Sequence, residues 1–172
     1  MSREWHVLYV KTGEEEKIAR ALRKEKLNAF VPKMNLMYRK QGKNLIIAKN
    51  MFPGYVFIEC EMNQTDLLLF LKNLHERIPK FMKLLKVDKE GTSVLYPDEK
   101  EYLQSLLNEK HVLDHSVGLI EGDKTIITEG PLKGLENTIL KIDRHKRRAL
   151  IEVMICNVPT QVKVSLEIIS KT

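Results

Sequence analysis

The side chains best suited to catalysis or metal binding are few and scattered in this sequence. Two isolated cysteines, Cys60 and Cys156, match neither a metal-binding spacing nor a disulfide framework. No serine or cysteine lies in a recognisable nucleophile motif. The histidines stand apart from one another, without the spacing of metal ligands: His6, His75, His111, His115 and His145. We therefore expect no catalytic residue, no metal, no cofactor and no enzymatic activity.

One glycine-rich segment, Gly130-Pro131-Leu132-Lys133-Gly134, invites comparison with a phosphate-binding loop. It lacks the Gly-Lys-Ser/Thr ending and the following helix that such a loop requires. A tight turn between two strands explains the glycines better, with Gly134 supplying a positive φ.

The densest cluster of positive charge is Arg144-His145-Lys146-Arg147-Arg148. It lies between an expected strand ending at Ile142 and another starting at Ala149. Such a run at a hairpin tip is typical of a solvated turn, but arginine forks also suit phosphates and guanine edges. Lys133 and Lys141 are expected on the same side, so we predict this set as an RNA-binding candidate, with the solvated turn as the alternative.

A second basic cluster, Arg39, Lys40 and Lys43, is expected at the tip of a β-hairpin. Met34, Leu36 and Tyr38 alternate with polar residues before it, and Leu45-Ile46-Ile47 returns after it. Contact with DNA or RNA is possible here, and a solvated turn is the alternative.

The stretch Met51 to Glu59 concentrates aromatic residues behind a Pro-Gly turn. Period-two alternation puts Tyr55 and Phe57 on one face of a strand and Val56 and Ile58 on the other. Tyr9 belongs to an earlier expected strand, Trp5 to Val10. Aromatic residues on strands are most often core, and the alternative is a partly exposed patch for a partner helix.

The composition indicates a folded globular protein. The chain has 172 residues, 43% of them hydrophobic, a net charge of +6 and a sequence pI of about 9.2. The basic balance favours a polyanionic partner. No stretch approaches the ~20 apolar residues of a membrane span, and the first residues lack a signal peptide's apolar core. We expect a cytoplasmic monomer that does not bind membranes.

The order of expected elements predicts two domains, an α+β domain over residues 1–109 and an all-β domain over 119–172. Residues 110–118 have no clear periodicity and are interpreted as a linker. The first domain has expected helices at 14–26, 66–77 and from Pro97 to about 109, and 81–87 is strand or loop. In the second, the expected strands are 124–128, 136–142, 149–156 and 161–169, which favours a small five-stranded β-barrel.

The landmarks, taken in order, resemble the NusG family of transcription elongation factors over nearly the whole chain. The N-terminal landmarks are Trp5–Glu15, Phe30-Val31-Pro32 and Phe52–Phe57. The C-terminal one is a KOW motif that runs from Glu121 through Glu136. The run Ile142–Ala149 is most similar to the specialised LoaP branch of antiterminators.

This resemblance implies an N-terminal domain that packs an aromatic surface on the clamp helices of RNA polymerase's largest subunit. Tyr9, Tyr55 and Phe57 hold the matching positions, so Tyr55 and Phe57 are expected to be partly exposed. Non-template DNA is a further contact in such proteins. The KOW barrel would engage Rho or a ribosomal protein or, as in LoaP-like members, a hairpin of the nascent RNA.

Relatives similar to RfaH can hide the polymerase surface beneath a helical C-terminal domain. Residues 124–169 are rich in Ile, Val and Thr, which favour helix less than Leu or Ala do. We therefore expect a β-barrel at rest without autoinhibition. The main hypothesis is that this protein is an antitermination factor. Its rivals are a general NusG-type factor without specific RNA recognition and a ribosome-associated KOW structural protein.

Overall fold

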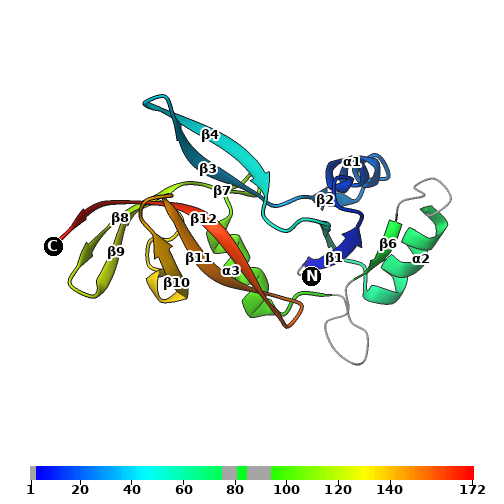
Figure 1. The fold of residues 1–172 in the computed structure, drawn as a ribbon. Coiled ribbons are helices and arrows are strands. Elements are labelled where there is room, and N and C mark those ends of the chain that lie inside the picture. Colours follow the sequence, from blue (N-terminus) through cyan, green and yellow to red (C-terminus); the bar gives the residue numbers. More distant parts are fainter. Residues whose placement is uncertain (1–2, 75–80, 85–93) are drawn as a thin grey trace. The chain divides into compact units, whose positions relative to one another are not determined.

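The computed structural model describes residues 3–74, 81–84 and 94–172 (Figure 1). Its backbone divides into two compact units. Unit 1 comprises Met1–Pro32, Phe52–Lys100 and Met154–Val158. Unit 2 comprises Lys33–Met51, Glu101–Val153 and Pro159–Thr172. The hairpin at 33–51 is thus grouped with the C-terminal strands.

Unit 1 is built on a four-stranded sheet in the order β2-β5-β1-β6. Strand β1 pairs antiparallel with both β5 and β6, and β2 pairs antiparallel with β5. The elements are β1 (Glu4–Val10), α1 (Glu15–Lys24), β2 (Asn28–Phe30), β5 (Tyr55–Cys60), α2 (Gln64–Leu74) and β6 (Phe81–Leu84). The end of the helix expected at 66–77, residues 75–77, lies outside the described residues. The same holds for residues 85–87 of the segment expected to be strand or loop.

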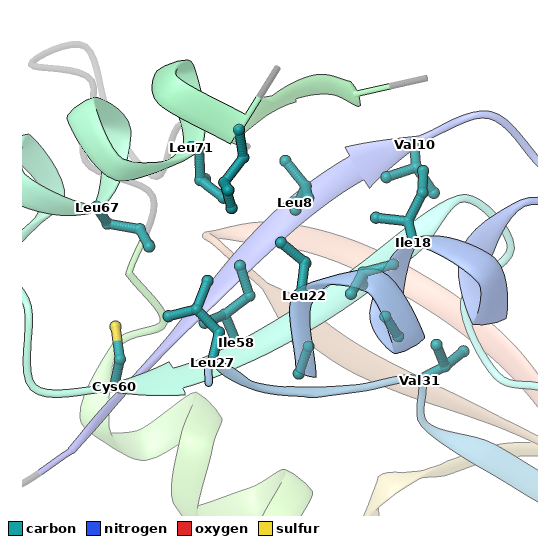
Figure 2. Packing of buried hydrophobic residues seen from close by; sticks show 14 residues of the cluster. Leu8, Val10, Ile18, Leu22, Leu27, Val31, Ile58, Cys60, Leu67 and Leu71 are labelled. Carbon is teal, nitrogen blue, oxygen red and sulfur yellow. The ribbon is translucent and has the colours of Figure 1, made fainter. Parts of the chain in front are cut away.

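The helices α1 and α2 cover one face of this sheet because each has an apolar stripe at helical spacing. Figure 2 shows Ile18 and Leu22 of α1 and Leu67 and Leu71 of α2 pointing toward Leu8 of β1. The predicted burial of Val56 and Ile58 is confirmed, since both lie in this cluster. Helix α2 begins after Asn63, whose Oδ1 accepts a hydrogen bond from Asp66 N at 2.8 Å.

Unit 2 contains a five-stranded sheet in the order β10-β11-β12-β8-β9 and a three-stranded sheet in the order β4-β3-β7. Helix α3 (Pro97–Leu106) starts at the expected proline; its first four residues are counted in unit 1 and the rest in unit 2. The strands are β3 (Lys33–Lys40), β4 (Lys43–Asn50), β7 (Val112–Leu113), β8 (Ser116–Glu121), β9 (Lys124–Glu129), β10 (Ile139–Asp143), β11 (Arg148–Ile155) and β12 (Val158–Lys171). These strands confirm the mixed α and β fold and the β-rich C-terminal half.

Two segments differ from their expected structure. Residues 136–138 form a 3-10 turn, η1 (Glu136–Thr138), rather than the start of a strand. The Glu136 carboxylate accepts a hydrogen bond from Ile127 N at 3.1 Å, and Thr138 N donates to Leu135 O, which curls the chain here. The segment expected as a linker, 110–118, contains β7 and the first residues of β8, because β7 pairs with β3 and β8 with β12.

Candidate functional site

The strand pair β1–β5 positions the aromatic residues that the sequence singles out. The antiparallel register places Tyr9 opposite Tyr55 and Val7 opposite Phe57. Since side chains alternate along a strand, these residues share the face turned away from the cluster of α1 and α2. The Tyr9 and Tyr55 rings meet edge to face, with centroids 6.1 Å apart.

Exposure separates the three predicted aromatic residues. Tyr9 is 39% exposed and Tyr55 is half-buried, but Phe57 is 0% exposed. The expectation that Phe57 is partly exposed is therefore wrong. Its ring lies 5.6 Å from Phe30, 5.9 Å from Phe52 and 6.2 Å from Trp5, which makes it the centre of an aromatic cluster.

The Pro53-Gly54 turn supports the tyrosine pair, a role that sequence reasoning missed. Gly54 has φ +86°, and a Cβ there would lie 3.3 Å from the Tyr9 ring and 3.1 Å from Val10 O. Glycine thus permits both the turn and the close approach. The Pro-Gly pair is the available signal, but it indicates a turn without indicating what packs on it.

Burial raises the pKa of Tyr55, and neighbouring Cys156 and Tyr9 raise it further. The phenol is therefore neutral at physiological pH. A neutral ring with a polar tip is a typical interface anchor, since it gives contact area with little charge to desolvate.

The basic tip, Arg144–Arg148, turns the chain from β10 to β11. Asp143 Oδ1 accepts a hydrogen bond from Lys146 N at 2.9 Å, and Arg147 has φ +55°. Because this hydrogen bond stabilises the charged carboxylate, it lowers the pKa of Asp143. Arg144, His145 and Lys146 are exposed, so the turn presents them to solvent.

Arg148 is not simply a solvent-facing charge. Its Nη1 donates to Met37 O at 2.9 Å, to Arg147 O at 3.0 Å and to Lys146 O at 3.2 Å. Its guanidinium carbon lies 4.8 Å from the centroid of the Tyr38 ring. Hydrogen bonds from Lys49 and then Arg148 lower the pKa of the Tyr38 phenol. Tyr38 was not predicted as a site residue, because nothing in its local sequence indicates this contact.

A partly buried polar network connects β3 and the basic tip with β12. Ser165 Oγ accepts a hydrogen bond from Met37 N at 3.1 Å and lies 2.7 Å from His115 Nδ1. Glu167 lies 3.7 Å from His115 Nε2 and 3.9 Å from Arg147 Nε. Burial lowers the pKa of His115. Glu167 acts in the opposite direction and raises this pKa, whereas Arg148 and Arg147 lower it further. Because Ser165 is 0% exposed, this Ser-His-Glu set is structural and does not offer a nucleophile to a substrate.

The remaining predicted cations are exposed on unit 2. Arg39, Lys40 and Lys43 flank a two-residue turn, Gln41-Gly42, whose φ values are +51° and +76°. Lys141 lies on β10, and Lys133 follows β9 in the turn where Gly134 has the predicted positive φ, +82°. These side chains are available to an anionic partner.

The described ranges 3–74, 81–84 and 94–172 contain no group of His, Cys, Asp and Glu side chains able to hold a metal ion. None of the helices in those ranges is long and apolar enough to cross a membrane.

Comparison with known proteins matches residues 3–100 to the family described as "Transcription termination factor nusG". A "Transcription termination/antitermination protein NusG" of Rickettsia felis is 24% identical over 180 residues, which cover 98% of this chain and 90% of that protein. The protein of the same description from Thermus thermophilus is 24% identical over 99% of this chain and 100% of its own length.

Among solved structures, one titled "Domain interaction in Thermotoga maritima NusG" is 19% identical, with a TM-score of 0.47. The matched region covers 96% of this chain and 94% of the chain in that structure. Because the family match spans more than half of the 172 residues, this chain belongs to the NusG family of transcription termination and antitermination factors.

Proposed function

We propose that this protein is a transcription antitermination factor that docks on RNA polymerase and suppresses pausing. The observation that carries the proposal is the tyrosine pair, Tyr9 and Tyr55, which remains accessible beside an otherwise buried aromatic cluster. Such rigid, half-exposed rings are typical hot spots for a partner helix. The clamp helices of the largest polymerase subunit are the proposed partner, with Phe57 supporting the pair from within the cluster.

We further propose that the basic tip holds a hairpin of the nascent RNA, as in the LoaP branch. Its support is the exposure of Arg144, His145 and Lys146 on a turn fixed by Asp143. RNA hairpins are read largely by shape and by unpaired loop bases, which suits a protruding tip. Lys133 and Lys141 would add phosphate contacts, and Arg39, Lys40 and Lys43 are proposed to contact DNA or RNA.

The proposed mechanism requires no covalent chemistry. Residues 1–109 act as the polymerase-binding domain and 119–172 as the KOW domain, in the cytoplasm and as a monomer. Hydrophobic docking keeps the polymerase clamp closed, while phosphate contacts tether the factor to one transcript and make binding salt-dependent.

The polymerase contact is tested with two tyrosines of nearly equal exposure, Tyr9 at 39% and Tyr96 at 40%. Tyr9→Ala should weaken binding to purified polymerase by at least about tenfold, since a lost hot spot costs ~2 kcal/mol or more. Tyr96→Ala serves as the matched control and should bind as the parent does. Equal affinity of all three proteins would contradict the docking surface.

The RNA contact is tested on stem-loops enriched by the parent protein from a pool with randomised loops. Arg144→Ala combined with Arg147→Ala should abolish binding in a gel shift and leave polymerase binding unchanged. If the double variant binds stem-loops as well as the parent, the basic tip is not the RNA site. Failure of the parent to enrich any stem-loop would instead favour a general factor that engages Rho or a ribosomal protein.

A further inference from the structure

A groove in unit 2 joins two basic segments that are far apart in the sequence. It has a volume of about 800 Å³. It is lined by Tyr38 and Arg39 of β3, by residues 145–148 of the basic tip and by Lys163 of β12. The hydrogen bond from Arg148 to Met37 O spans 111 positions of sequence and fixes this juxtaposition.

The charge of the groove is of one sign. Its lining includes the cations of Arg39, Lys146, Arg147, Arg148 and Lys163, and no carboxylate. Like charges gathered on one concave surface repel one another, so they favour an anion that brings several negative groups. A polyphosphate backbone is such an anion.

The size of the groove distinguishes among polyanions. Its volume lies within the roughly 300–1,000 Å³ of pockets for small ligands, which suits nucleotide-sized groups rather than a whole double helix. The Arg148 guanidinium lies over the Tyr38 ring, and Lys49 Nζ lies 5.5 Å from the centroid of the same ring, so an unpaired base would stack on the guanidinium that Tyr38 supports. Since Arg148 is already bonded to Met37 O and lies over the Tyr38 ring, little ordering is needed on binding.

We propose that this groove binds an unpaired segment of RNA, with phosphates on Arg39, Lys146 and Lys163 and a base against Tyr38 and Arg148. The inference rests on the proposed RNA-binding function and deepens it. Arg144, which lies outside the groove lining, meets the folded hairpin, and the groove takes the single strand beside it.

The test measures the fluorescence anisotropy of labelled oligouridine RNA, which forms no hairpin, with the full chain. Lys163→Gln and Arg39→Gln should each weaken binding severalfold and reduce the slope of log affinity against log salt by about 0.7, the value for one phosphate contact on a single strand. Lys171→Gln, at another exposed lysine of β12, is the matched control and should bind as the parent does. Tyr38→Ala should weaken binding at least about fivefold and Tyr38→Phe much less.

A second measurement does not depend on folding of variants. Ultraviolet crosslinking of a probe containing 4-thiouridine to the parent protein should modify the peptides carrying Tyr38 or Lys163. Crosslinks found only elsewhere, or equal affinity of the groove variants and the control, would overturn the groove assignment. Equal affinity for oligodeoxythymidine would overturn the assignment to RNA.

These outcomes separate the two proposals. If Arg144→Ala, at a tip residue outside the groove lining, weakens stem-loop binding but the groove variants bind oligouridine like the parent, the groove is refuted and the tip stands. If the parent binds oligouridine through the groove and no stem-loop through the tip, the hairpin proposal is refuted instead.

Discussion

Arg148 carries a full charge at the basic tip and also joins three backbone carbonyls to one aromatic ring. Its Nη1 lies within hydrogen-bonding distance of Met37 O, Lys146 O and Arg147 O, while the guanidinium lies over Tyr38. Lysine has the same charge but lacks the planar guanidinium that lies over the ring. Arg148 is therefore a positioning residue for the tip, whereas Arg144 is exposed.

Comparison of Arg148→Lys with Arg144→Lys separates these roles. We expect Arg148→Lys to lower the free energy of unfolding by about 1–2 kcal/mol, because charged hydrogen bonds to the backbone are lost, and to weaken RNA binding although the charge is kept. Arg144→Lys should change neither strongly. In tyrosine-labelled protein, NMR titration should show that Arg148→Ala raises the pKa of the Tyr38 phenol, since Arg148 helps to lower it. An unchanged phenol pKa would contradict this role.

At the scale of elements, tight turns connect the C-terminal strands, and their glycines are not equivalent. Gly130 directly follows β9 with φ +102°, and a Cβ there would lie 2.6 Å from His115 O and from Ser116 Cα. Gly122, in the turn between β8 and β9, has φ +60° and open space around the same position. The turn at Gly130 therefore packs against β8, whereas the turn at Gly122 has room for a side chain.

Gly130→Ala should lower the free energy of unfolding by about 2–4 kcal/mol, because steric overlap and left-handed strain each cost ~1–3 kcal/mol. Gly122→Ala should cost about 1–2 kcal/mol from backbone strain alone. Chemical denaturation followed by circular dichroism measures both. Equal losses would mean that the close approach to Ser116 does not restrict the turn.

At the scale of the whole molecule, each compact unit contains a histidine whose folded pKa is lowered by burial. His6 in unit 1 is 0% exposed, and burial lowers its pKa below 6.5 against the smaller influence of Met62 O and Glu4. His115 in unit 2 behaves in the same way. An unfolded chain takes up these protons near the ordinary pKa of 6.5, and the folded chain only at lower pH.

The histidine contribution to stability is therefore fully present above about pH 7.5 and is lost as pH falls through 6.5 toward the folded values, at no more than ~1.4 kcal/mol per pH unit for each group. The denaturant concentration at the midpoint of unfolding should therefore decrease as the pH is lowered from about 7.5 to about 5.5. Fluorescence of Trp5, the single tryptophan, reports on the unit of His6. His6→Gln should flatten the pH dependence of this midpoint. Folded-state NMR titration giving values at or above 6.5 would contradict the assignment.

The sequence by itself determined the features that depend on local chemistry. Alternation and β-branched residues specify the strand Tyr55–Cys60, apolar spacing specifies the stripes of α1 and α2, and Pro53-Gly54 specifies the turn. The order of landmarks was enough to indicate the family. The reason is that strand faces, helix stripes and turns are set by neighbours along the chain.

The tertiary structure decided how much of each face is covered and which distant segments meet. Alternation correctly puts Phe57 on the face of Tyr55, but its burial depends on Trp5, Phe30 and Phe52, which reach it from other segments. Likewise, the contact of Arg148 with Tyr38 joins residues of strands β11 and β3. Periodicity assigns a residue to a face, whereas burial and long-range contacts require the packing of the folded chain.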